Sequence, residues 1–309
     1  MKGGDRIRTG TASYLKRIKQ YWDMYLILLP SLILLVLFKY TPMWGIRIAF
    51  QDFNIFNANG SPYVGFANFA KLFTSKDFYM ILKNTLLISV YKIVVLFPLG
   101  VFIALVLNEI RSTAFKRAAQ TIIYIPHFFS WIVVAGIFFT FLSSSGMVNQ
   151  LFNALGAGSV NFLSSPKLFR SVLVFSAGWK ELGWNAIVFL AAIAGIDQEL
   201  YEAAELDGAG RLRQIVNITL PGILSTIVLM FILRIGNLLE AGTEQILAMY
   251  NPVVYGVSDV IGTYVYRVGL GQMDYSFTTA VGLFNSTVGF LFVIIGNFLS
   301  RRTTGKGIW

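Results

Sequence analysis

Residues 201–221 read YEAAELDGAGRLRQIVNITLP. Up to Gly208, alanine and leucine form one side of a predicted short helix, and glutamates lie beside them. Gly208 lacks a Cβ and can end this helix in a left-handed conformation. Pro221 suits the first turn of the helix that follows. A helix this short is not stable alone, so we expect it to be held by its own bundle or by a groove of a partner.

The composition around this stretch is that of a membrane protein. Of the 309 residues, 56% are hydrophobic and 13% are charged, against about 25% charged in soluble domains. So few charges could not cover an apolar core in water, and the apolar surface must face lipid. The net charge of +10, which in a soluble protein would suggest nucleic acid, is attributed to loops on the cytoplasmic side. The chain has no cysteine, which excludes disulfides and thiol metal sites.

Six segments are long and apolar enough to span a bilayer, which takes about 20 residues. They are residues 21–42, 81–107, 121–142, 171–195, 218–240 and 277–299. Lipid offers no partners to backbone groups, so we predict an all-α polytopic fold. The first segment follows a basic lead and lacks a cleavage pattern, so it is interpreted as an uncleaved helix. Prolines at 30, 98, 126 and 221 indicate either ordinary helix bending or hinges.

Positive charge predicts the orientation. Fourteen of the 25 Lys and Arg lie in the N-terminal segment, in loops 108–120 and 196–217 and in the tail, whereas five lie in the other loops. This asymmetry places both termini in the cytoplasm, as an even number of spans also requires.

The order Glu202-Ala203-Ala204, three residues, Gly208, nine residues, Ile218-x-Leu220-Pro221 resembles the coupling loop of bacterial ABC importer permeases. Tyr201 and the triplet 207–209 resemble the carbohydrate-uptake branch. In that family the loop docks in a cleft of the ATPase and transmits its closure to the spans. The resemblance implies that the residues that contact the ATPase or shape the loop are Tyr201, Glu202, Ala203, Ala204, Asp207, Gly208, Ala209, Leu220 and Pro221.

Further stretches are similar to the LplB-like polysaccharide permeases, which have a MetI-like transport core: 50–53, 64–69, 84–86, 107–111, 124–128 and 259–267. Ser225 departs from the pattern, because sugar permeases often have a second proline there. The resemblance implies a cytoplasmic basic segment (1–20), a first transmembrane helix (21–50), an extracellular loop (51–80), a five-helix core (81–300) with the coupling loop at 196–217, and a cytoplasmic tail (301–309).

The same resemblance implies partners. They are a second homologous permease against which the first span packs, two copies of an ABC ATPase that hold ATP and magnesium, an extracellular sugar-binding lipoprotein and membrane lipid, with no nucleic acid. The setting is the cytoplasmic membrane of a bacterium, and no cofactor is expected in this chain. The only Gly-Lys pair, at 305–306, lacks the upstream glycine of a phosphate-binding loop. We therefore expect no enzyme activity, catalytic residue or metal site here.

Polar residues within spans normally face a bundle interior or a water-filled path. The candidates for the substrate path are Trp179, Lys180, Glu181, Trp184, Asn185, Arg234, Asn237, Glu240 and Asn285. Other interpretations stay open: Lys180 and Glu181 at headgroup level or as an internal ion pair, Arg234 paired with a carboxylate, and the tryptophans in contact with lipid or core. A buried Arg234 would suit uronic acid carboxylates.

Three regions have no assigned role. His127 is the only histidine; a structural hydrogen bond to a carbonyl freed by Pro126 is favoured over a proton relay. Residues 11–23 form either a helix at the membrane surface or a simple basic flank. Lys92 lies inside a predicted span without an assigned function.

The function favoured by this sequence is ATP-driven import of oligosaccharides by alternating access, with pectin-type or rhamnogalacturonan fragments indicated by the subgroup. The alternatives are an ABC permease for a non-sugar solute, an ion-driven secondary transporter and a membrane-embedded enzyme.

Overall fold

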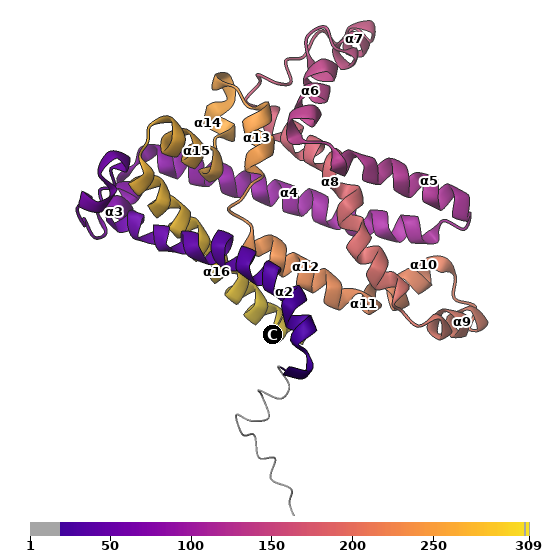
Figure 1. Cartoon of the computed structure of the whole chain (residues 1–309). Helices are drawn as coiled ribbons and strands as arrows, with labels where there is room; N and C mark the ends of the chain where they lie inside the picture. The colour runs from indigo at the N-terminus through magenta and orange to yellow at the C-terminus, as the bar shows by residue number, and fades with distance from the viewer. Residues whose placement is uncertain (1–18, 306, 309) are drawn as a thin grey trace, which may run out of the picture.

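The computed structural model describes residues 19–305, 307 and 308 (Figure 1), so residues 1–18 and most of the segment 11–23 lie outside it. This part of the chain is helical apart from its connections and one isolated β-bridge between Gln51 and Tyr63. Four helical segments are long and apolar enough to cross a membrane: Trp22–Phe50, Lys76–Glu109, Trp131–Ala154 and Tyr275–Arg302. Two bent helix pairs raise the number to six if each is one span. The predicted all-α polytopic fold is confirmed.

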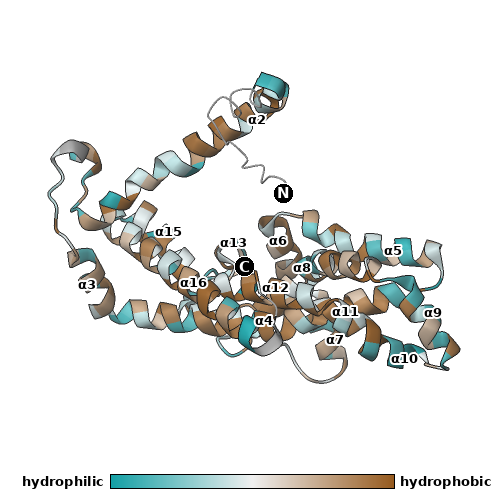
Figure 2. Ribbon diagram, turned by 90° about the horizontal axis from the view of Figure 1, so that it is seen from below, coloured by the Kyte–Doolittle hydropathy of each residue, from teal (hydrophilic) through white to brown (hydrophobic). Residues whose placement is uncertain are grey.

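The first span stands apart from the bundle (Figure 2). It comprises α2 (Trp22–Leu35), a wide π turn η1 (Val36–Tyr40) and a tighter helix η2 (Thr41–Phe50). No residue of α2 is buried, although its sequence is strongly apolar. The span packs on α16 (Tyr275–Thr304) through η2. An apolar helix without cover in this chain requires lipid or another subunit around it.

A short ordered connection follows the first span. It contains η3 (Ile55–Gly60) and α3 (Ala67–Thr74). The Asn68 side-chain amide donates to the carbonyls of Ala49 and Gln51, both at 3.0 Å. Lys71 pairs with Asp274 at 2.7 Å at the start of α16. These contacts attach the end of the first span to the core.

Two long helices, α4 (Lys76–Glu109) and α8 (Phe169–Ala194), form the centre of the core. Gly100 of α4 lies 3.8 Å from the Asn185 side chain, measured from the position that a Cβ would occupy. The rings of Phe97 and Phe189 meet edge to face at 5.9 Å. Small residues at such contacts let helix backbones approach closely.

The third predicted span, 121–142, is not one helix. The chain forms α5 (Thr113–Tyr124), a short turn η4 (Ile125–Phe128) and then α6 (Trp131–Leu142), and α7 (Met147–Ala154) follows. Pro126 lacks an N–H and lies in the turn, and the Ser130 side chain caps α6 by accepting from the N–H of Val133. The break replaces the expected continuous helix because α8 supplies a partner for the freed backbone: the Lys180 ammonium donates to the His127 carbonyl at 2.6 Å.

The fifth span is also bent. After α9 (Gln198–Leu206), the chain forms α10 (Arg211–Gln214), a π turn η5 (Ile215–Thr219) and α11 (Leu220–Gly222), then bends by 59° into α12 (Leu224–Gly236). Pro221 therefore lies near the end of a helical stretch and not in the first turn of the next span. The wide turn η5 precedes it, as expected where proline disrupts the regular hydrogen bonding. The helix ends at Gly236, four residues before the predicted limit of the span.

Short helices close the end of the bundle opposite α9 (Figure 1). They are α13 (Thr243–Met249), η6 (Pro252–Val254), α14 (Tyr255–Ser258) and α15 (Ile261–Gly271). Asp259 is buried and pairs with Arg267 at 2.5 Å, and the Thr263 hydroxyl donates to the same carboxylate at 2.6 Å. The hydrogen bonds that Arg267 donates to Asp259 raise the pKa of the Arg267 guanidinium. This pair stabilises α15 against the loop before it.

Candidate functional site

The loop after α8 has the predicted helix–turn–helix form. The Asp197 side chain caps α9 by accepting from the N–H of Glu199 at 3.0 Å. At the other end, Gly208 is left-handed, with φ +75°. Its N–H donates to the Glu205 carbonyl at 3.0 Å, and that of Ala209 donates to the Ala204 carbonyl at 2.8 Å. This pair of bonds is a Schellman termination, so the expected left-handed end at Gly208 is confirmed.

The α9 helix leaves its apolar side open. None of its residues is buried, and the side chains of Leu200 and Leu206 are 53% and 90% exposed. It lies at the edge of the structure in both views (Figures 1 and 2). Its Tyr201 hydroxyl is 2.9 Å from the hydroxyl of buried Thr219. The sequence left two ways to hold this helix, its own bundle or a groove of a partner. The bundle contributes the contact between Tyr201 and Thr219, whereas Leu200 and Leu206 remain exposed and available to a partner.

The other loop candidates lie around this helix. Glu202, Ala203, Ala204 and Asp207 are in α9 or at its end, and Ala209 follows the left-handed turn. Leu220 and Pro221 are in α11, after the π turn. Glu202, Ala203, Ala204 and Asp207 therefore lie together on a helix without a buried residue. Leu220 and Pro221 belong to the bent span.

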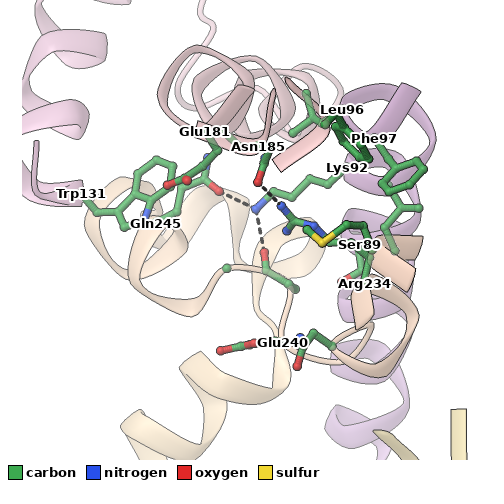
Figure 3. Close-up of a pocket in the computed structure, with 17 residues that line it drawn as sticks. Ser89, Lys92, Leu96, Phe97, Trp131, Glu181, Asn185, Arg234, Glu240 and Gln245 are labelled. Atoms are coloured by element: carbon green, nitrogen blue, oxygen red, sulfur yellow. Dashed lines mark hydrogen bonds between the residues drawn. The ribbon is translucent and has the colours of Figure 1, made fainter. Parts of the chain in front are cut away.

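A cavity of about 290 Å³ lies between α4, α8, α12 and the turn that leads to α13 (Figure 3). Five predicted path residues line it: Glu181, Asn185, Arg234, Asn237 and Glu240. One Arg234 nitrogen donates to the Asn185 side-chain oxygen at 2.7 Å and so joins α12 to α8. The alternative interpretation, in which Arg234 pairs with a carboxylate, is wrong for the described residues, since no carboxylate oxygen among them lies within 4.0 Å of it.

Several lining residues were not among the predicted path residues. They include Ser89, Lys92, Trp131 and Gln245. The Lys92 ammonium donates to the Ala241 carbonyl at 2.7 Å and to the Gln245 side-chain oxygen at 2.5 Å. The signal for Lys92 was visible as a lone cation in an apolar span. Gln245 gave no signal, because its burial depends on how α13 folds back onto α8.

The remaining candidates lie outside this cavity. Trp179 lines a separate groove between α4 and α8, Trp184 stacks on the His127 ring at 4.2 Å, and Asn285 lies in α16 with its side-chain oxygen buried and unpaired within the described chain. The three candidates Trp179, Trp184 and Asn185 on α8 therefore do not meet at one site. Side chains so far apart around one helix point to different neighbours.

Lys180 and His127 belong to one polar cluster at the break between α5 and α6. The Glu181 carboxylate lies 2.9 Å from His127 Nδ1 and 3.4 Å from the Lys180 ammonium. The expected bond from the histidine ring to a freed carbonyl is wrong. The ring lies against the Glu181 carboxylate instead, and the His127 carbonyl accepts a hydrogen bond from Lys180. Among the open interpretations, the structure shows Lys180 and Glu181 as an internal ion pair.

Among the described residues, no group of three or more His, Cys, Asp or Glu is placed to hold a metal ion. The cavity offers hydrogen-bonding and charged groups, and it is open on one side at Arg234, Asn237 and Glu240, whose side chains are exposed.

Comparison with known proteins gives a consistent result. The family described as "binding-protein-dependent transport system inner membrane component" matches residues 97–305. A polygalacturonan/rhamnogalacturonan transport system permease protein, YteP of Bacillus subtilis, is 44% identical over 96% of this chain and 92% of its own length. Protein LplB of the same organism is 42% identical over 96% and 94%.

A solved structure is similar over almost the whole chain. It is described as a bacterial ABC transporter involved in the import of the acidic polysaccharide alginate, and one of its chains matches with a TM-score of 0.87 and 42% identity. The match covers 94% of this chain and 99% of that one. The resemblance to LplB-like, MetI-like permeases is thereby confirmed. The chain belongs to the family of inner-membrane components of binding-protein-dependent transport systems, and it is the polytopic permease subunit of a bacterial ABC importer, whose ATPase is a separate chain.

Proposed function

We propose that this permease imports oligosaccharides by alternating access and receives mechanical work from its ATPase through α9. The observation that carries the coupling is the exposed, doubly capped α9 with an uncovered leucine side. Such a helix needs a groove in another protein, because it is too short and too exposed to be stabilised by burial in its own chain. Its partners are a second permease, two ATPase copies that hold ATP and magnesium, and a sugar-binding lipoprotein.

The names of the relatives support a carbohydrate cargo. YteP is named for polygalacturonan and rhamnogalacturonan, and the similar structure is named for alginate. These are acidic polysaccharides or contain acidic sugars, and Arg234 at the open side of the cavity is a cation without a carboxylate partner in the described residues. We infer that uronate-containing oligosaccharides are the preferred cargo.

The coupling is tested in proteoliposomes that contain the complete transporter. Glu202→Lys reverses the charge on the exposed α9 without touching a buried residue, so assembly should be kept while uptake per ATP hydrolysed falls. Glu199→Lys, on the same helix but in its first turn, is the matched control for net charge. Unchanged uptake in the Glu202 variant contradicts the role of α9. Uptake by this chain alone, driven by an ion gradient, contradicts the whole proposal.

The cargo charge is tested separately. Arg234→Met should reduce uptake of acidic oligosaccharides more than that of neutral ones of equal length. Equal loss for both would assign Arg234 a purely structural role through Asn185.

A further inference from the structure

One lysine holds the segment that closes the cavity. Lys92, in the middle of α4, donates to the Ala241 carbonyl and to the Gln245 side chain. Gln245 is fully buried, and its amide donates to the Leu173 carbonyl and to the Ser176 hydroxyl of α8, both at 2.7 Å. Through these bonds, Lys92 and Gln245 connect the turn before α13 to both central helices.

The turn itself has an unfavourable backbone conformation. Ala241 and Gly242 are both left-handed, with φ of 47° and 84°. Residues other than glycine adopt this conformation rarely and at a cost. Such residues persist where surrounding contacts hold them. The contacts here are the bonds from Lys92, so their loss should release the turn.

The charge of Lys92 is not neutralised by a carboxylate. Both acceptors are uncharged oxygens, and no described carboxylate oxygen lies within 4.0 Å of the ammonium. Glu181 lines the same cavity but is occupied by Lys180 and His127. Arg234 lines the same cavity as Lys92 (Figure 3). Glu240 also lines the cavity, but no described carboxylate oxygen lies within 4.0 Å of Lys92 or Arg234. Two cations that share a cavity without such a direct partner favour the binding of an anion.

From these observations we propose that Lys92 and Arg234 form one carboxylate site, and that an acidic cargo draws Lys92 away from Ala241 and Gln245 and so loosens the turn before α13. The inference rests on the proposed import of oligosaccharides and adds a role for Lys92. An ammonium has three donors, of which two are used here. Hydrogen bonds between ionised groups are stronger than those to neutral oxygens. A carboxylate can therefore compete for Lys92 better than a neutral hydroxyl can.

The chain has no cysteine, so a single introduced thiol reports on α13 without background from this chain, and the labelled chain is separated from its partners before the label is measured. Ala248 is half-buried on α13 and packs against the core, which makes Ala248→Cys a small change. The assembled transporter is kept free of nucleotide and is incubated with one of two trimers. One is a galacturonic acid trimer, and the other has the same linkage but its carboxyls are reduced to alcohols. The rate of thiol labelling is then measured against trimer concentration.

The acidic trimer should raise the labelling rate. The concentration that gives half of the maximal effect should be about tenfold lower for the acidic trimer than for the neutral one, because the neutral trimer lacks one charged hydrogen bond. Lys92→Met should label fast from the start and respond to neither trimer. Lys92→Arg should restore the preference for the acidic trimer. A merely structural lysine would change the starting rate alone.

Two results overturn the inference: equal responses to both trimers in the parent reporter, or a retained acidic response in Lys92→Met. The first needs no change at Lys92, so it decides even if that variant does not fold. ATP-driven uptake of either trimer with the binding protein is measured in parallel. If both trimers are taken up and both change the labelling rate equally, this inference is contradicted and the proposed function stands. If neither trimer is taken up, the proposed function itself is contradicted.

Discussion

Replacement of Gly208 by alanine isolates the shape of the α9 loop from its chemistry. Gly208 has φ +75°, and no heavy atom lies within 4 Å of the position that a Cβ would occupy. The cost of Gly208→Ala is therefore a backbone cost alone, about 1–2 kcal/mol for a left-handed alanine. Because α9 has no buried residue, little packing energy is available to offset it.

Gly210 provides a matched control two residues away. It also has open space around it, but its φ of −70° and ψ of 164° suit any residue. Gly210→Ala loses some preference as the first cap of α10 and gains from a less flexible unfolded chain. These effects are similar in size and opposite in sign, so the net change should be near zero.

The assay is amide hydrogen exchange on the assembled transporter, combined with uptake per ATP hydrolysed. The N–H groups of Gly208 and Ala209 donate the two bonds that close the helix, and a cost of 1–2 kcal/mol raises the open population about 5- to 30-fold. Exchange of the Ala209 amide should accelerate by this factor in Gly208→Ala, and uptake should fall. Equal exchange and uptake in the two variants would refute the reasoning.

Three further outcomes test the structure. Asp259→Ala leaves Arg267, which lies partly exposed between tyrosine rings, without its carboxylate. The free energy of unfolding should fall by about 1.5–3 kcal/mol, as for lost hydrogen bonds to a charged group, and the thermal midpoint should fall with it. An unchanged midpoint contradicts a stabilising pair. Tyr201→Phe leaves the buried Thr219 hydroxyl without this partner, which should cost about 1 kcal/mol and accelerate amide exchange in α9 but not in α16. Gly183→Ala would press a Cβ against the carbonyl of Ile123. The free energy of unfolding should fall by about 1–3 kcal/mol, and less transporter should assemble. A normal yield and melting temperature would show that α5 moves freely against α8.

The fold was largely predictable because lipid imposes a simple rule on backbone polar groups. That rule identifies apolar stretches but not the breaks within them. The interruption at 125–130 depends on Lys180, which donates to His127 from another helix 53 residues away. Pro126 was a local signal for a bend, but only the tertiary partner makes a full turn there acceptable.

The α9 loop was predictable in detail because its contacts are local. The Asp197 cap and the bonds that close at Gly208 join residues at most five positions apart. The cavity was predictable only in part. Polar residues of α8 and α12 could be identified as candidates because the sequence around them is apolar. Trp179 and Trp184 were candidates too, but their side chains lie outside the cavity. Gln245 lies in a connection, where a polar residue is ordinary, and its role follows from burial against α8.

The position of α9 explains how one exposed helix could act on the cavity. It follows α8 directly, with a bend of 71° between the two helices, and through α10, η5 and α11 it leads into α12, with a second bend of 59°. The helices on either side of the loop, α8 and α12, carry Asn185 and Arg234, which face each other across the cavity at 2.7 Å. In the coupling proposed above, a displacement of α9 would act on both walls at once, and a shift of one wall against the other would stretch this bond. Bends at fixed positions between stiff helices concentrate such motion, which makes the contact between Arg234 and Asn185 the place where work done at α9 would first alter the binding of cargo.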